Sequence, residues 1–224
     1  MRFESALKVV RLLKTTIGQP LSIRGICQGI DLSYQPTYKH VRALEREGVI
    51  RTQKQGREVR CELAASAATS LWLGLVSVAE RRELVAAGGE LAEAAAAVVQ
   101  HARAVRTATP PIMVLLPPSG PHESSATLIA VTAEDEHHLL GILGASISPT
   151  IRLQALTEEA FRRRMERPFQ RYPLLAESVV LSGEQRFWDL AFADETPGPE
   201  PAPAEPIVRP RRRRRSAANR TAGE

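Results

Sequence analysis

The segment from Ser22 to Leu63 constrains the fold of this chain more strongly than any other stretch. Its pattern predicts a short helix over 22–29, a tight turn over 30–32 and a longer helix over 33–47 with a polar exposed face. Gly48 follows, where the left-handed end of a helix favours glycine, and the remaining residues have the character of a β-hairpin. The sequence therefore predicts a helix-turn-helix that runs directly into a hairpin.

Local signals support the boundaries of this unit. Ser22 and Ser33 are of the residue type that caps a helix N-terminus, because a serine hydroxyl accepts an otherwise unpaired backbone N–H. Pro36 falls in the first turn of its helix, where the missing N–H costs little. The hairpin is expected to close around Gln55-Gly56-Arg57, and a further amphipathic helix is expected over 2–16. One face of that first helix carries Phe3, Leu7, Val10 and Lys14.

Positive charge is concentrated at the two ends of the chain. Residues 1–63 hold 12 Lys and Arg against 6 Asp and Glu, whereas residues 64–193 hold 11 against 14. In residues 194–224 the balance is again positive, with 7 against 5. A positive field attracts polyphosphates and speeds encounter with them, so both ends favour a nucleic-acid partner.

The composition argues against a secreted, membrane-spanning or disulfide-stabilised protein. Cys27 and Cys61 fit neither a disulfide framework nor a metal-ligand spacing, which predicts two reduced thiols. The longest uncharged stretch, Ala64–Ala79, is too short and too polar to span a bilayer. The first residues carry charge and show no apolar leader segment. We therefore expect a cytoplasmic protein that does not associate with a membrane.

Residues 64–109 are rich in alanine and are predicted to form a helical linker, divided into two helices at Gly88-Gly89. Leu84, Leu91 and Val98 recur in it at seven-residue spacing. This spacing suits a packing surface between two domains, and it also suits a helix that pairs with a second copy of the chain. Both interpretations stay open.

Residues 110–193 carry the strand and helix pattern of a small α/β domain. Strands are expected over 112–116, 127–132 and 151–156, with a helix over 136–144. Thr157 is the expected cap of a further helix. An apolar run over 174–181, Gly183 and a final helix over 184–192 complete the domain.

Two stretches concentrate arginine outside the first 63 residues. Residues 161–171 hold five, which suits a solvated helix face beside Glu158, Glu159 and Glu166 or a second contact with nucleic acid. Residues 194–224 combine a proline-rich run with five consecutive arginines and lack any apolar period, so this tail is predicted to be disordered. Its arginines are expected to contact phosphates regardless of base sequence, although a solubilising tail has the same composition.

The stretch over 32–50 resembles the winged-helix families of bacterial and archaeal transcriptional regulators, and the resemblance covers residues 3–63. It implies that the helix over 33–47 lies in the major groove of double-stranded DNA, with Val41 and Leu44 turned inward. Gln35 would bind adenine, and Lys39 or Arg42 would bind guanine or a phosphate. The residues expected to contact DNA are Ser33, Gln35, Thr37, Tyr38, Lys39, Arg42, Arg51, Lys54, Arg57, Arg60, Arg211, Arg212, Arg213, Arg214 and Arg215.

Two alternatives to this assignment stay open. Tyr38 has the size to pack inward with only its hydroxyl exposed. Some winged helices bind protein, so the same polar helix face also suits a protein-binding module.

Residues 112–192 look like the small nucleotidyltransferase domains often fused to archaeal-type winged helices, in the order of their elements and in the ending Ser178–Leu190. Active members of that family have a Gly-Ser turn after the first strand and two aspartates that bind Mg²⁺ on the second. Here Pro117 and its neighbours follow the first strand, and Ser125 and Thr127 stand where the aspartates belong. Neutral hydroxyls cannot replace the anionic oxygen ligands of a two-metal site, so the resemblance implies a non-catalytic copy. An unrelated α/β domain is the alternative.

The sequence thus predicts an α+β protein with four parts: a winged helix-turn-helix domain over 1–63, a helical linker over 64–109, a nucleotidyltransferase-like α/β domain over 110–193 and a disordered Pro-rich and Arg-rich tail over 194–224. It favours a sequence-specific DNA-binding transcriptional regulator. A homodimer is expected, because one winged helix reads too few base pairs for a unique site. No catalytic residue, cofactor or metal is expected, and the domain over 110–193 is free to bind a protein partner. The alternatives are a nucleotidyltransferase-type enzyme, an antitoxin with an autoregulatory winged helix, and a DNA-organising protein.

Overall fold

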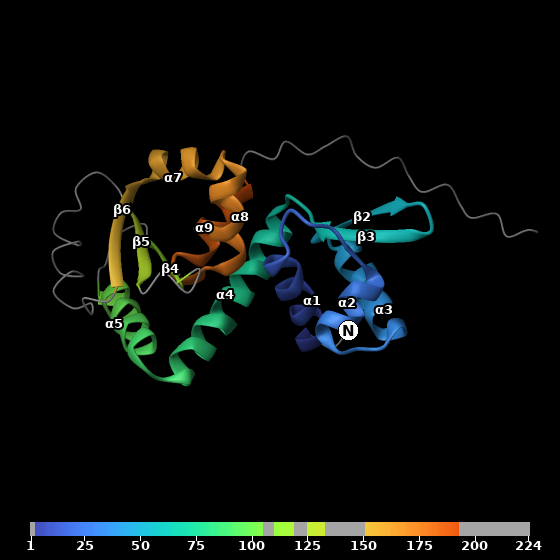
Figure 1. Ribbon diagram of the computed structural model, residues 1–224, viewed down its shortest axis with the longest axis horizontal. Helices are drawn as coiled ribbons and strands as arrows, with labels where there is room; N and C mark the ends of the chain where they lie inside the picture. The colour runs from blue at the N-terminus through green and yellow to red at the C-terminus, as the bar shows by residue number, and fades with distance from the viewer. Residues whose placement is uncertain (1–2, 105–109, 119–124, 133–150, 193–224) are drawn as a thin grey trace, which may run out of the picture.

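The protein has a mixed α+β fold, seen in a computed structural model that describes residues 3–104, 110–118, 125–132 and 151–192 (Figure 1). This confirms the fold class expected from the sequence. Residues 3–63, here called the N-terminal region, hold three helices and a small sheet. Residues 110–192, the C-terminal region, hold a four-stranded sheet and its covering helices. The long helix α4 (Ala67–Ala87) runs between the two regions.

The N-terminal region contains the three helices and the hairpin that the pattern predicts, together with a short strand that it does not predict, β1 (Leu21–Ser22). The predicted elements are α1 (Phe3–Thr15), α2 (Ile23–Ile30), α3 (Tyr34–Arg46), β2 (Ile50–Gln55) and β3 (Glu58–Leu63). The three strands form an antiparallel sheet in the order β1-β3-β2, in which β2 and β3 are the expected hairpin. The helix-turn-helix and the hairpin are therefore confirmed as local structure.

The ends of these helices follow from individual residues. The Ser22 hydroxyl accepts a hydrogen bond from the Gly25 N–H at 3.1 Å, as expected of a helix cap. Ser33 has the extended backbone of a cap, but its hydroxyl makes no capping bond, so this expectation was wrong. Gly48 adopts a φ of 73° directly after α3, a left-handed conformation that glycine tolerates without a steric penalty. The chain can therefore turn at once from α3 into β2.

The predicted linker is built into the fold. Helix α4 is separated from α5 (Glu90–Ala104) at Gly88-Gly89, as the sequence indicates. It packs against α1 of the N-terminal region and against α9 (Glu184–Phe192) of the C-terminal region. Leu73 and Val76 of α4 belong to a continuous hydrophobic core that includes residues of both regions. The two regions thus share part of one core.

The seven-residue repeat in this stretch is used inside the chain. Val98 is buried, and Leu84 and Leu91 pack against the same hydrophobic cluster as Met113 and Leu115 of the second sheet. Val98 is thus buried by the chain itself, and Leu84 and Leu91 are partly buried. This packing agrees with the interpretation of the stripe as a packing surface, and pairing with a second copy stays a prediction.

The C-terminal region is built on β4 (Ile112–Leu116), β5 (Ala126–Thr132), β6 (Ile151–Thr157) and β7 (Val179–Ser182). Their order is β6-β5-β4-β7; β5 and β6 are parallel, and the other neighbours are antiparallel. The three strands predicted up to residue 156 are confirmed. The apolar run over 174–181 is divided between the end of α8 (Pro168–Glu177) and β7. The helix expected over 136–144 lies outside the described residues.

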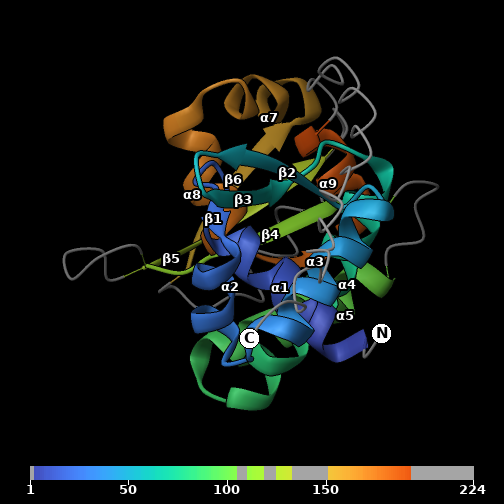
Figure 2. The same cartoon turned by 90° about the vertical axis from the view of Figure 1, so that its right-hand side faces the viewer.

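Helices cover both faces of this sheet (Figure 2). Alanines and Val98 of α5 pack on one face, with Met113, Leu128 and Leu181 of the strands. Phe187 and Trp188 of α9 belong to the core on the other face, together with Phe161 of α7 (Glu158–Met165). The Thr157 hydroxyl caps α7 as predicted, accepting from the Ala160 N–H at 3.1 Å.

A buried polar cluster joins the N-terminal region to the rest of the chain. Lys14 of α1 is only 2% exposed, and its Nζ donates to Glu80 Oε2 at 2.6 Å and to the Ser178 carbonyl at 2.9 Å. Burial lowers the pKa of Lys14, and the Glu80 carboxylate opposes this effect. Arg11 also pairs with Glu83 at 2.6 Å. Three segments distant in the sequence thus meet at one cation.

Within the described part of the chain, no helix is both long and apolar enough to cross a membrane.

Candidate nucleic-acid interface

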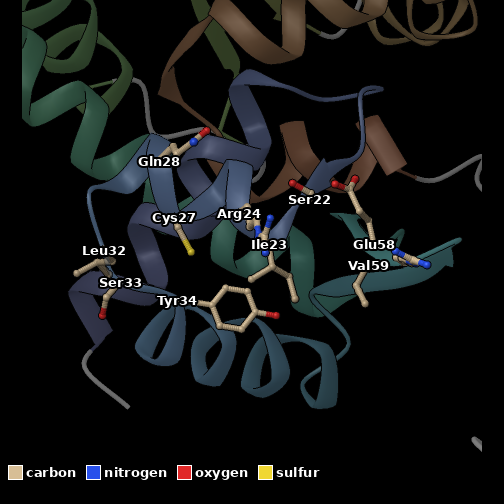
Figure 3. A pocket seen from close by; sticks show the side chains of 11 residues that line it. Ser22, Ile23, Arg24, Cys27, Gln28, Leu32, Ser33, Tyr34, Glu58 and Val59 are labelled. Atoms are coloured by element: carbon tan, nitrogen blue, oxygen red, sulfur yellow. The ribbon is translucent and has the colours of Figure 1, made fainter.

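A groove of about 930 Å³ opens between α2, the start of α3 and the tip of the hairpin (Figure 3). Its walls are formed by Ser22, Ile23, Arg24, Cys27, Gln28, Leu32, Ser33, Tyr34, Arg57, Glu58 and Val59. Side chains from all three elements therefore converge on one concave surface. Ser33 and Arg57, both predicted from the sequence, line this groove.

Helix α3 presents the polar face expected of it, with one exception. Gln35, Tyr38, Lys39 and Arg42 are exposed, and their spacing of three and four residues places them on one side of the helix. Thr37 is fully buried, and its hydroxyl donates to the Ser33 carbonyl at 3.0 Å. The expected contact of Thr37 with DNA was therefore wrong, because this side chain faces the core beside Val41 and Leu44.

Tyr38 lies at the surface, contrary to the alternative in which its ring packs inward. Its ring stacks on that of Tyr34 with centroids 6.1 Å apart, and the Arg42 guanidinium lies 5.3 Å from its centroid. Arg42 Nε also donates to the Tyr38 hydroxyl at 3.1 Å. Tyr34, Tyr38 and Arg42 thus form one exposed stack along α3.

An ion pair holds Arg42 from its other side. Arg42 Nη1 lies 2.6 Å from Glu45 Oε2, and Glu45 also accepts a hydrogen bond from the Thr52 hydroxyl of β2. The bond to Glu45, followed by the bond to Tyr38, raises the pKa of Arg42. Arg42 therefore stays charged, and its side chain is held in one orientation. The guanidinium N–H groups that take no part in these two bonds can donate hydrogen bonds to a ligand.

The four cations expected on the hairpin do not lie together. Residues opposite one another in the register share a face of the hairpin, so Arg51 lies with Glu62 and with Arg60 on one face. Lys54 lies on the other face with Val59, which lines the groove. Alternation along the strands therefore places Arg51 and Arg60 on one face of the hairpin and Lys54 on the other.

Arg51 and Arg60 are also engaged within the chain. Arg51 Nε lies 2.8 Å from Glu62 Oε1, and it lines a small hollow with Tyr172 of the C-terminal region. Arg60 Nη2 lies 3.2 Å from Glu58 Oε2. Among the four predicted hairpin cations, Arg57 lines the groove, and Lys54 shares a face of the hairpin with Val59, which also lines it.

Three further polar residues belong to this surface and were missed by the sequence reasoning. Arg24 and Gln28 of α2 line the groove, and Arg46 is exposed one turn beyond Arg42 on α3. Their spacing could have identified them, because residues four apart on a helix share a face. Arg24 and Gln28 are four apart on α2, and Arg46 is four residues after Arg42 on α3. The predicted contacts at Arg211, Arg212, Arg213, Arg214 and Arg215 lie outside the described residues.

In the C-terminal region, the register places Thr127 between Leu116 and Arg152 on adjacent strands. Thr127 is one of the two hydroxyl residues that occupy the aspartate positions of the nucleotidyltransferase resemblance. Among the described residues, no three His, Cys, Asp or Glu side chains gather in a way that could hold a metal ion.

The chain matches no protein-family model, no curated protein and no solved structure, so its own side chains have to carry any functional proposal.

Proposed function

We propose that this chain is a transcriptional regulator that binds double-stranded DNA in a sequence-specific manner, with residues 3–63 acting as a winged helix. The observation that carries the proposal is the exposed stripe of Gln35, Lys39 and Arg42 along α3, beside a groove that α2 and the hairpin complete. A stripe of this kind on a single helix fits the major groove of B-DNA, which is wide enough to admit an α-helix.

The chemistry of the stripe matches base edges. A glutamine amide forms paired hydrogen bonds with adenine, and an arginine or a lysine binds the two acceptors of guanine. Gln35, Lys39 and Arg42 occur at intervals of four and three residues, so they follow one line along the helix. They are the residues that would read the sequence.

The groove supplies cations for the DNA backbone. Arg24 comes from α2 and Arg57 from the turn of the hairpin, and Lys54 lies on the same side of the hairpin as the groove. Contacts of this kind fix the position of a protein on the duplex without reading its sequence. Arg51 contributes less in this arrangement, because it pairs with Glu62 on the other face of the hairpin, and Arg60 is already paired with Glu58.

The homodimer has a structural candidate that differs from the predicted one. Leu71, Leu75, Val78 and Val85 hold four of the five positions of a coiled-coil seam along α4, with Arg82 at the remaining one, and Leu71 and Leu75 are 59% and 46% exposed. We propose that this seam pairs with the same seam of a second copy, which would supply the second reading helix. Sedimentation analysis should give a dimer for the natural chain and a monomer for L71E/L75E; a natural chain that sediments as a monomer at micromolar concentration contradicts the pairing.

One observation favours a second candidate function, the binding of a protein. Tyr34 and Tyr38 form an exposed aromatic stack beside the groove, and tyrosine is enriched where proteins bind one another. A protein partner would use the same surface, so the two functions are separable only by experiment.

The test is the selection of bound sequences from random double-stranded DNA with the full chain. The proposal predicts enrichment of a defined motif, and tighter binding of that motif than of a scrambled duplex in fluorescence anisotropy. Equal binding of all sequences would favour a DNA-organising protein. An absence of binding at low salt would leave the protein-binding function as the better candidate.

A further inference from the structure

A second hollow, of about 520 Å³, lies at one end of the four-stranded sheet, away from the groove. Strands β5 and β6 contribute Thr127, Arg152 and Gln154 to it, and helices α7 and α8 contribute Arg164, Phe169 and Leu174. Its volume falls within the range of sites for small molecules, about 300–1,000 Å³.

The register of the strands explains why a hollow forms here. Thr127 and Arg152 are direct neighbours across β5 and β6, and Gln154 lies two residues further on the same face. Further along β5 this face carries Ile129 and Val131, which are buried in the core. At the end of the sheet, the polar side chains of Thr127, Arg152 and Gln154 replace the apolar ones, so the core stops and a space remains.

Arg164 lines this space without a carboxylate partner in the described part of the chain. Its neighbours on α7, Arg162 and Arg163, pair with Glu158 and Glu159. Arg164 Nη1 instead donates to Gln154 Oε1 at 3.1 Å, and its Nε is buried with no hydrogen-bond partner. Burial lowers the pKa of Arg164, with no neighbouring acid to oppose the effect. A half-buried guanidinium without a counter-charge is unfavourable, and a bound anion would offset that cost.

The other residues that line the hollow also favour a bound anion. Arg152 projects from the adjacent strand with no ion pair among the described residues, and no described acidic side chain lines the hollow. Phe169 is 72% exposed at its edge, and Leu174 forms part of an apolar wall. An exposed phenylalanine beside two guanidinium groups suits a ligand with one charged end and one flat apolar part.

We propose that this hollow binds a small organic anion, whose carboxylate or phosphate is held by Arg152 and Arg164 and whose planar part packs against Phe169. Such a site goes beyond the proposed function, since it stands whether residues 3–63 bind DNA or a protein.

Isothermal titration calorimetry of the full chain tests the site with three probes: inorganic phosphate, benzoate and adenosine 5′-monophosphate. At least one of the two aromatic anions should bind with a stoichiometry of one and more tightly than phosphate. Arg152→Gln and Arg164→Gln should each weaken that binding about tenfold or more, because each removes a charged hydrogen-bond donor. No binding of any probe would overturn the proposal.

Arg163→Gln is the matched control, because Arg163 carries the same charge one position away and its side chain is 70% exposed. It should bind as the natural chain does. If all three variants bind equally well, the anions are held by the cations of the N-terminal region or the tail, and the proposal fails. Arg152 is exposed, so its variant tests the site even if Arg164→Gln folds poorly.

Phe169→Ala tests the contact with the planar part of the ligand separately from the contact with its anionic group. This variant should weaken the binding of benzoate or adenosine 5′-monophosphate several-fold and leave that of phosphate unchanged. Unchanged affinity for the aromatic anions would contradict the role assigned to Phe169.

Discussion

On α3 and at the groove the cations stand at the surface, whereas at the end of the four-stranded sheet Arg152 and Arg164 line a hollow. The surface cations are arranged along a helix and suit a long polyanion that approaches from outside. The hollow, with a volume of about 520 Å³, has space for a small molecule but not for a long polyanion. Charge by itself therefore does not define a partner: the shape of the surface around the cations and the carboxylates beside them decide which anion fits.

Both cationic surfaces belong to one folded unit, because the N-terminal and C-terminal regions share a core, and the largest expected effect tests this unity. Lys14→Met should lower the free energy of unfolding by about 3 kcal/mol, because the buried Glu80 carboxylate and the Ser178 carbonyl would be left without their shared cation. Urea unfolding followed by circular dichroism and by tryptophan fluorescence measures the change. Since the two regions share a core around α4, one transition is expected in both signals.

Lys8→Met is the control for this variant. Lys8 is exposed on the same helix and pairs with Glu4, so its replacement should change stability by less than about 0.5 kcal/mol. Two separate unfolding transitions in the natural chain would show that the regions fold independently.

The next largest effect concerns the surface cations. Lys39→Ala and Arg42→Ala should each weaken binding to a selected DNA site by about ten- to a hundredfold, since a good base contact contributes about 1–3 kcal/mol. Fluorescence anisotropy with the selected duplex measures this decrease in affinity. Arg51→Ala is the matched control, because Arg51 lies on the opposite face of the hairpin, paired with Glu62. A decrease for Arg51→Ala as large as that for Arg42→Ala would contradict the separation of the hairpin cations.

Local signals predicted the elements of this fold well. The Ser22 cap, the turn at Gly48 and the break at Gly88-Gly89 are each set by neighbouring residues, and all three are present. Features that depend on distant residues were missed. The local pattern places Lys14 on the apolar face of its helix, but nothing near Lys14 in the sequence indicates its partner Glu80, 66 positions away.

In the candidate sites, too, the features set by neighbouring residues were predictable and those set by distant residues were not. Alternation along the hairpin already places Arg51 and Lys54 on opposite faces, but the packing of the sheet against the helices decides which face borders the groove. Thr37 was assigned to the exposed face because it is polar, although it lies next to the buried stripe and bonds the Ser33 carbonyl. The hollow around Arg164 could not be predicted from the sequence, because two strands and two helices have to be placed in space before it appears.

The arginine-rich tail is expected to add phosphate contacts to those of the groove. Deletion of residues 209–224 should weaken binding to selected and scrambled duplexes alike, because contacts between arginines and phosphates do not depend on the base sequence. The salt dependence of binding should become shallower, by a slope of about 1 for each phosphate that the tail no longer neutralises. Anisotropy titrations over a range of salt concentrations measure both quantities. A decrease in affinity restricted to the selected duplex would instead assign the tail to sequence reading.

The smallest expected effect concerns the ion pair between Glu158 and Arg162. Arg162 has a carboxylate partner, whereas Arg164, two positions along the same helix, has none among the described residues. Hydrogen bonding from Arg162, followed by the charge of Arg186, holds the pKa of Glu158 below its ordinary value, so the folded protein favours the carboxylate. Glu158 therefore stabilises the fold above its ordinary pKa, about 4.3, and this contribution is lost as the pH falls through the folded-state pKa. Glu158→Gln should lower the thermal midpoint slightly at pH 7, and the difference from the natural chain should close in acid. Arg164→Gln should show no such closing difference, because Arg164 has no carboxylate partner among the described residues. A pH-dependent difference for Arg164→Gln would mean that an acid already neutralises the hollow, which would remove the distinction between the two cationic surfaces.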